Sequence, residues 1–236
     1  AYEFDAATGQ LYYINSQPTG GDHPCYITID KTGKWVITGN YTGGNISVFP
    51  VAADGSLKHY VQRIQHTGSS VNKSRQEKPH VHCVNFHPTS KLLFVADLGN
   101  DTIDMIPYED KNGFKLKETE TKSFNVPAGS GPRHIVFDED HQLVYVTFEL
   151  TNEIGVFDFQ NSDLKLKEIV SLTESKTTSG SAAELKLTSD NNFLYATVRG
   201  NDNILVGFKT NEGEKLEKIQ TMSTESHPRN FILTDN

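Results

Sequence analysis

The stretch GPRHIVFDEDHQLVYVTFELTNEIGVF, residues 131–157, contains three short apolar segments separated by polar turns. Apolar segments of this length, bounded by turn residues, predict three consecutive antiparallel β-strands. Arg133 and His134 stand at the start of the first segment, and Glu149 directly follows the second. Turns and strand ends usually carry Gly, Asn, Asp or Pro. The charged residues at these ends therefore need an explanation beyond the hairpin itself.

The same pattern recurs along the chain. Full copies begin at His23, Val81, Gly131 and Ser181, and a fifth, HPRNFILTDN, begins at His227. Each full copy reads as strand, polar turn, strand, tight turn and strand, and connecting segments such as LKLKEIVSLTE, from Leu164, add a fourth strand. Units of about 40–50 residues with four short strands are typical of β-propeller blades. We therefore predict an all-β protein, a β-propeller of four-stranded blades forming a single domain over residues 1–236; a β-sandwich would not explain the repeat.

The predicted ring does not close on these residues. The fifth copy contains only a first strand, and AYEFDAATGQLYYI, residues 1–14, can supply only the outer strands of a blade. A blade assembled from the two would lack its middle strands. We expect a fragment of about four to five blades from a larger propeller, truncated at both ends, with the native N-terminus before Ala1.

Composition excludes several classes of partner. The net charge is −8 with acidic and basic residues interleaved, which argues against nucleic-acid binding. The hydrophobic content is 36%, and no apolar run approaches the roughly 18 residues of a membrane span. Cys25 and Cys83 form no CxxC motif, so buried free thiols are expected. The oligomeric state is not determined by these features.

Aligning the copies produces two sets of equivalent positions. The first, at the start of each first strand, is Cys25, His82, Arg133, Ala183 and Arg229, at spacings of 57, 51, 50 and 46 residues. The second, after each second strand, is Tyr41, Leu98, Glu149 and Arg199. In a propeller the first strand lines the central channel and the second runs antiparallel beside it, so both sets should meet at one mouth of the channel. A lone charge at a strand end is usually solvated, but recurrence at equivalent positions predicts a site.

The chemistry of these residues is that of an anion site. Guanidinium groups bind anionic oxygens bidentately, and a histidine with a carboxylate can transfer protons near neutral pH. The residues predict an anionic small-molecule ligand and acid–base or hydrolytic chemistry. His80, His82 and His87 could be considered as metal ligands, but Glu149 is the only carboxylate at the equivalent positions, so we expect no metal and no other cofactor. The polar insert 66–80 is expected to be a solvated loop or a rim over the site.

These motifs carry a family likeness over nearly the whole chain. GNYTGGNISVFPVAADGSL, PHVHCVNFHPTSKLLFVADLGND, GPRHIVFDEDHQLVYVTFEL and HPRNF resemble the lactonase seven-bladed propeller family, which includes propeller-type 6-phosphogluconolactonases and fungal carboxy-muconate cyclases. The resemblance implies a parent of seven blades. It also implies hydrolysis of 6-phospho-D-glucono-1,5-lactone, a small anionic lactone, to 6-phosphogluconate in the pentose phosphate pathway. We expect a cytoplasmic location.

The family's site maps onto His82, Arg133, Glu149 and Arg199, and we expect His80, His134 and Arg229 to contribute to substrate binding, with His80 ranked below His82. Arg133 and Arg199 would hold the phosphate or polarise the carbonyl. His82 would activate water or deliver a proton, and Glu149 would orient His82 or share the role of base. No covalent nucleophile is required. A muconate-type lactonising cycloisomerase and a non-catalytic ligand- or protein-binding propeller remain as alternatives.

Overall fold

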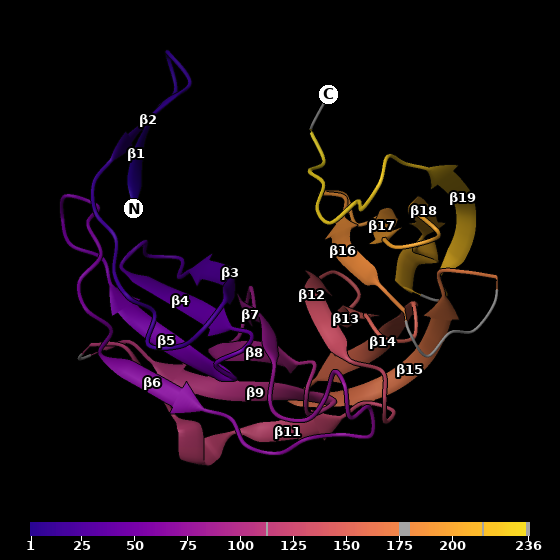
Figure 1. The fold of residues 1–236 in the computed structure, drawn as a ribbon, viewed down its shortest axis with the longest axis horizontal. Helices are drawn as coiled ribbons and strands as arrows, with labels where there is room; N and C mark the ends of the chain where they lie inside the picture. The colour runs from indigo at the N-terminus through magenta and orange to yellow at the C-terminus, as the bar shows by residue number, and fades with distance from the viewer. Residues whose placement is uncertain (112, 175–179, 214, 235–236) are drawn as a thin grey trace.

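The computed structural model describes residues 1–111, 113–174, 180–213 and 215–234, and these residues form short antiparallel strands with two single-turn 3-10 helices. Four sheets are arranged in an arc around a common centre (Figure 1). Their innermost strands are β3 (Pro24–Ile29), β7 (Val81–Phe86), β12 (Pro132–Asp138) and β16 (Ala182–Leu187). The next strands outward are β4 (Trp35–Asn40), β8 (Leu92–Asp97), β13 (Leu143–Phe148) and β17 (Phe193–Val198). The four-stranded propeller blade predicted from the repeat is confirmed.

The outer half of each blade completes the antiparallel order. The third strands are β5 (Asn45–Pro50), β9 (Thr102–Glu109), β14 (Glu153–Gln160) and β18 (Ile204–Lys209). The fourth strands are β6 (Gln62–Gln65), β15 (Asp163–Ser171) and β19 (Glu217–Ser223) in the first, third and fourth blades. In the second blade this place is divided between β10 (Lys115–Leu116) and β11 (Lys122–Asn125), which both pair with β9 and are separated by the helix η1 (Glu118–Glu120). A second 3-10 helix, η2 (Asn211–Gly213), precedes β19.

Apolar side chains between neighbouring blades form the core. Three clusters fill the three interfaces, joining the first blade to the second, the second to the third, and the third to the fourth. Both β8 and β13 are buried along their whole length. The second and third blades each lie between two others, which cover both faces of the sheet. By contrast, β19 is exposed throughout. The blades therefore stabilise one another face to face, and the loops at the strand ends are left to form a site.

The two ends of the chain differ from the repeated blades. Strands β1 (Tyr2–Asp5) and β2 (Gln10–Tyr13) pair only with each other, as a hairpin apart from the four blades (Figure 1). The predicted first strand of a fifth unit, from His227, is not formed in the described residues up to Thr234, because no neighbouring second strand is available to complete its hydrogen-bond ladder. The first residues of this segment and of two full copies nevertheless share a left-handed backbone, with φ of 52° at His23, 63° at Gly131 and 59° at His227.

Both cysteines are free thiols, as expected, but they differ in burial. Cys83 is buried in the interface between the second and third blades, whereas Cys25 is only half-buried. Among the described residues, no helix is long and apolar enough to cross a membrane.

Candidate active site

The innermost strands of the four blades begin with the same backbone irregularity. The strand register shifts between Pro24 and Tyr26, Val81 and Cys83, Pro132 and Ile135, and Ala182 and Leu185. The residues skipped by these bulges include the whole first set of equivalent positions within the four blades. A bulge redirects the side chain that it carries. In the third and fourth blades, Thr147 and Thr197 accept hydrogen bonds from the backbone amides of His134 and Glu184, at 3.1 and 3.0 Å.

The second set of equivalent positions is fixed by one repeated backbone hydrogen bond. The amides of Tyr41, Leu98, Glu149 and Arg199 each donate to the carbonyl of the residue directly before the adjacent inner strand, at 2.8–3.1 Å. The start of the first strand and the end of the second are therefore neighbours in every blade. The structure thus brings together residues from successive blades at one mouth of the channel, as the repeat predicts.

Glu149 lies at the centre of this arrangement. Its Oε2 accepts a hydrogen bond from Arg133 Nε at 2.8 Å and lies 3.2 Å from Arg199 Nη2. Its Oε1 accepts from Arg75 Nη2 at 2.6 Å. His82 Nε2 lies 3.9 Å from Oε2, beyond hydrogen-bonding distance. One buried carboxylate is therefore shared by three guanidinium groups, and a histidine lies beside it.

These charges determine the protonation of the two acid–base candidates. Burial alone would raise the pKa of Glu149, but the arginines around it outweigh burial and the net pKa is lowered, so the carboxylate stays ionised. Burial and the positive charge of Arg133 both lower the pKa of His82 well below its ordinary value. His82 is therefore neutral near pH 7. Its Nδ1 is buried and has no hydrogen-bond partner among the described residues.

A cavity of about 840 Å³ opens at this channel mouth. The charged and histidine side chains on its wall are Arg75, His82, Glu149, Arg199, Arg229, His23 and His227. Arg229 is exposed and makes no hydrogen bond or ion pair with another described residue. Arg133, the most deeply buried of the arginines, with 2% of its surface exposed, lies behind the wall and reaches the cavity only through Glu149.

Two predicted substrate-binding residues lie outside the cavity wall. His134 donates from Nδ1 to Glu184 Oε1 at 2.9 Å and accepts from Arg133 Nη1 through Nε2 at 2.8 Å. Because it follows Arg133 in the bulge, it faces into the protein. His80 is also buried: its Nδ1 lies 3.1 Å from the Tyr41 carbonyl oxygen, and its ring stacks on that of Tyr41. Protein groups lie within hydrogen-bonding distance of all four ring nitrogens, and substrate binding by either histidine stays a prediction.

The site also contains an arginine that the repeat did not identify. Arg75 belongs to the insert 66–80, which has no counterpart in the other copies, so alignment could not reveal it. The insert forms a rim over the site, one of the two expectations for it. The one feature of the sequence that could have indicated Arg75 is the composition of the insert, because Arg75 is the only arginine in residues 66–80. Tyr41, an equivalent position without an assigned role, accepts a hydrogen bond from Arg75 Nη2 at 3.2 Å.

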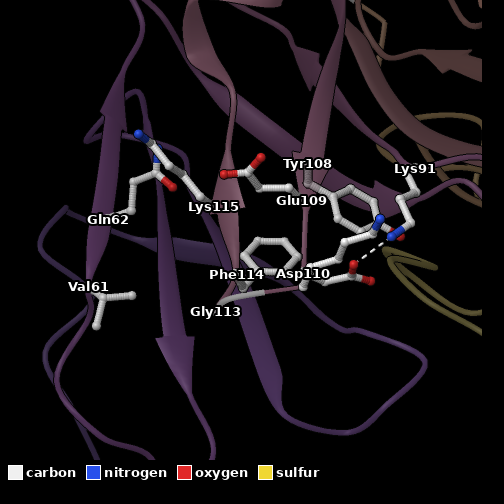
Figure 2. A pocket seen from close by; sticks show the side chains of 10 residues that line it. Val61, Gln62, Lys91, Tyr108, Glu109, Asp110, Gly113, Phe114 and Lys115 are labelled. Atoms are coloured by element: carbon white, nitrogen blue, oxygen red, sulfur yellow. Dashed lines mark hydrogen bonds and ion pairs between the residues drawn. The ribbon is translucent and has the colours of Figure 1, made fainter.

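A second cavity, of about 730 Å³, lies on the outer strands of the second blade, away from the equivalent positions. Figure 2 shows Lys91 paired with Asp110 at one side of it, and Tyr108 near Phe114. The rings of Tyr108 and Phe114 stack with centroids 5.2 Å apart. The side chains here are aromatic groups and exposed ion pairs, without the buried carboxylate and arginines of the channel mouth.

Comparison with known proteins agrees with this arrangement. The family model described as "Lactonase, 7-bladed beta-propeller" matches residues 1–236. The chain belongs to this family. The resemblance of its motifs to the lactonase propellers is thereby confirmed.

Individual lactonase-propeller relatives are similar over most of this chain. A 6-phosphogluconolactonase of Bacillus subtilis is 34% identical, over 99% of this chain and 66% of its own length. A Bacteroides fragilis protein of known structure is 33% identical, with a TM-score of 0.91 over 99% of this chain and 66% of its own. The periplasmic gluconolactonase of Pseudomonas aeruginosa is 31% identical, with a TM-score of 0.87 over 97% and 65%. The chain thus spans just under two thirds of the length of these relatives.

Proposed function

We propose that the protein hydrolyses 6-phospho-D-glucono-1,5-lactone to 6-phosphogluconate. The observation that carries the proposal is the distribution of arginine. The sequence has five arginines, and four of them, Arg75, Arg133, Arg199 and Arg229, gather at or behind one cavity. No lysine lines this cavity in the described part of the chain, although the sequence has 17. Arginine is the side chain that best matches planar or tetrahedral oxyanions.

The charge balance favours an anionic substrate. Four guanidinium groups gather here around one carboxylate, Glu149, which pairs with three of them, so the cavity is strongly positive in a chain whose net charge is −8. Such a local field attracts anions and would stabilise both a substrate phosphate and the oxyanion that forms at the lactone carbonyl. The 6-phosphogluconolactonase of Bacillus subtilis supports this choice of substrate.

The protonation states suggest distinct roles for the two acid–base candidates. Glu149 is a poor base, because its lowered pKa and its three arginine partners stabilise the ionised form. We assign it the role of holding the arginines in place. His82 is neutral and lines the cavity, so its Nε2, the ring nitrogen beside Glu149, can accept a proton from water.

The reaction then needs no covalent intermediate. Water, losing its proton to His82, attacks C1 of the lactone, and Arg199 stabilises the oxyanion. The bond between C1 and the ring oxygen breaks as the tetrahedral intermediate collapses, and His82 returns the proton to that oxygen. The product is an open-chain acid, which ionises at neutral pH.

The test is turnover of defined substrates by the purified protein. Acid release from 6-phosphoglucono-1,5-lactone, corrected for spontaneous hydrolysis, should rise in proportion to enzyme concentration, and turnover of a carboxy-muconate should be absent. Arg199→Gln should lower kcat/KM by about 10²- to 10³-fold, as expected for loss of an oxyanion donor.

The matched control is Arg63→Gln, which removes the fifth arginine. Arg63 lies on β6, and its Nη1 donates to the Gly20 carbonyl away from the cavity, so kcat/KM should be retained. If the rate of acid release did not depend on enzyme concentration, the lactonase assignment would be wrong. Muconate lactonisation by the same sample would favour the cycloisomerase.

A further inference from the structure

The insert 66–80 between β6 and β7 is anchored to the second blade. Gln76 is fully buried, donates from Nε2 to the Leu98 carbonyl at 2.9 Å and accepts from the Asn72 amide at 3.1 Å. Ser70 donates its hydroxyl to Asp101 at 2.6 Å. Arg75 directly precedes the buried Gln76, so the backbone that carries it is held in place at the rim of the cavity.

The guanidinium of Arg75 has unused hydrogen-bonding capacity. Both of its bonds, to Glu149 Oε1 at 2.6 Å and to the Tyr41 hydroxyl at 3.2 Å, come from Nη2. Its Nε and Nη1 have no hydrogen-bond partner within the described ranges, and 38% of the side chain is exposed. Arg75 is thus held by one nitrogen while its remaining donors are open to the cavity.

The two strand-borne arginines are more constrained. Arg133 donates to His134 and to the Ala183 carbonyl as well as to Glu149, with 2% of its side chain exposed. Arg199 donates from Nε to the Ser181 carbonyl at 3.0 Å and is 13% exposed. Both are tied to the backbone of the fourth blade, whereas Arg75 is bound only through side chains.

The two oxygens of Glu149 separate these groups. Oε2 faces Arg133, Arg199 and, at 3.9 Å, His82. Arg199 and His82 are the groups that we assign to the chemistry at the lactone carbonyl. Oε1 faces Arg75, whose own partner is the Tyr41 hydroxyl. The open donors of Arg75 are therefore on the other side of the carboxylate from the proposed chemistry. A substrate group bound there would be a substituent remote from the lactone carbonyl.

We propose that Arg75 is the specificity-determining residue of this site and binds the phosphate of a phosphorylated sugar lactone. The insert thereby makes the propeller prefer phosphorylated to unphosphorylated lactones. A phosphate dianion presents three oxygens to the two open donors of the guanidinium, and Glu149 and Tyr41 keep the side chain oriented before it binds. The reaction named here rests on the proposed function; the binding of phosphate by Arg75 can be tested without it.

The first experiment compares two substrates in matched variants. For Arg75→Gln, we expect kcat/KM for 6-phosphoglucono-1,5-lactone to fall about 10- to 100-fold, mainly through KM, from loss of a charge-assisted hydrogen bond. For unphosphorylated glucono-1,5-lactone it should stay within about twofold, so the preference collapses. Arg75→Lys should recover part of the preference for the phosphorylated lactone. Lys78→Gln is the control, because it removes one positive charge from an exposed side chain of the same insert.

Several outcomes would overturn the assignment. An equal loss on both lactones would show that Arg75 only supports Glu149. An unchanged preference in Arg75→Gln would exclude Arg75 as the phosphate ligand. If Arg229→Gln alone abolished the preference, the phosphate would belong to Arg229, the exposed arginine on the same cavity wall. Thermal unfolding of each variant shows whether the folded state is retained.

The second experiment measures binding and is independent of turnover. In calorimetric titrations, the wild-type protein should bind 6-phosphogluconate more tightly than gluconate, and Arg75→Gln should lose most of that difference while Lys78→Gln keeps it. If neither lactone is turned over, the proposed function fails, yet this titration still decides the role of Arg75. Equal wild-type affinity for the two sugar acids would overturn the inference.

Discussion

Two histidines with buried side chains, one at the channel mouth and one among the outer strands, have pKa values shifted in opposite directions. His82, at the channel mouth, and His66, between the outer strands of the first two blades, have side chains only 4% and 6% exposed. Burial lowers the pKa of His82, and the positive charge of Arg133 lowers it further. His66 donates to Asp97 at 2.9 Å and lies 3.6 Å from Asp104; burial lowers its pKa, but these carboxylates outweigh burial and raise it.

With both side chains buried, the charge of the neighbouring groups decides which of the two histidines keeps a proton. A protonated His66 forms ion pairs and has no proton-accepting nitrogen, so it suits a structural role. A neutral His82 retains an acceptor and lines a cavity, so it suits proton transfer.

The largest effect should come from Glu149→Gln, which keeps the shape of the side chain but removes the charge shared by the arginines. We expect activity to fall about 10²- to 10³-fold, because the guanidinium groups lose their orienting partner. The free energy of unfolding should fall by about 3–5 kcal/mol, because buried cations are left unpaired. Lactone turnover and urea unfolding measure the two quantities.

Asp104→Asn is the comparison at the other cluster. Asp104, on β9, lies beside His66, so its replacement should reduce stability. It does not line the channel cavity, so kcat should be retained. Equal losses of activity in the two variants would break the distinction between a functional and a structural cluster.

The next effect concerns the two histidines directly. His82→Gln should lower kcat by about 10²-fold through loss of the general base, whereas His66→Gln should leave kcat unchanged. Because the pKa of His82 is lowered, the wild-type kcat should be constant from pH 6.5 upward through neutrality and fall only in more acidic solution, where His82 gains a proton. A rate that rises through pH 7 would contradict a neutral His82.

The smallest effect is the pH dependence of stability contributed by His66. Its folded-state pKa is raised, so its ion pair stabilises the fold fully below the unfolded-state pKa of about 6.5. That contribution is lost as the pH rises through the higher folded-state pKa. The difference in unfolding free energy between wild type and His66→Gln, measured in urea from pH 6 to pH 8.5, should therefore shrink.

His82 should show the opposite sign. Its folded-state pKa is lowered, so stability is lost as the pH falls below about 6.5, where the unfolded state binds a proton that the folded state does not. A urea series on His82→Gln, extended to about pH 5, should therefore diverge from wild type only below the unfolded-state pKa of about 6.5. Parallel curves for the two variants would contradict the assigned charges.

The part of the site that could be predicted from the sequence is the part that follows from the repeat. Alignment of the copies placed His82, Arg133, Glu149 and Arg199 at equivalent strand ends, and the structure brings all four together. The orientation of side chains within the bulges could not be predicted in this way. Arg133 and His134 are adjacent in sequence, but Arg133 reaches Glu149 and His134 is directed toward Glu184.

The sequence by itself determined the blade, because alternating apolar strands with recurring turns repeat the same local preferences four times. It also determined which strand ends would meet, because the strands of a propeller blade run antiparallel in a fixed order. Only the tertiary structure decided that Arg75 joins the site. Its position depends on the packing of Gln76 and Ser70 against the second blade, contacts that no repeat or local propensity encodes. Likewise, the different protonation states of His66 and His82 arise from groups that only folding brings close.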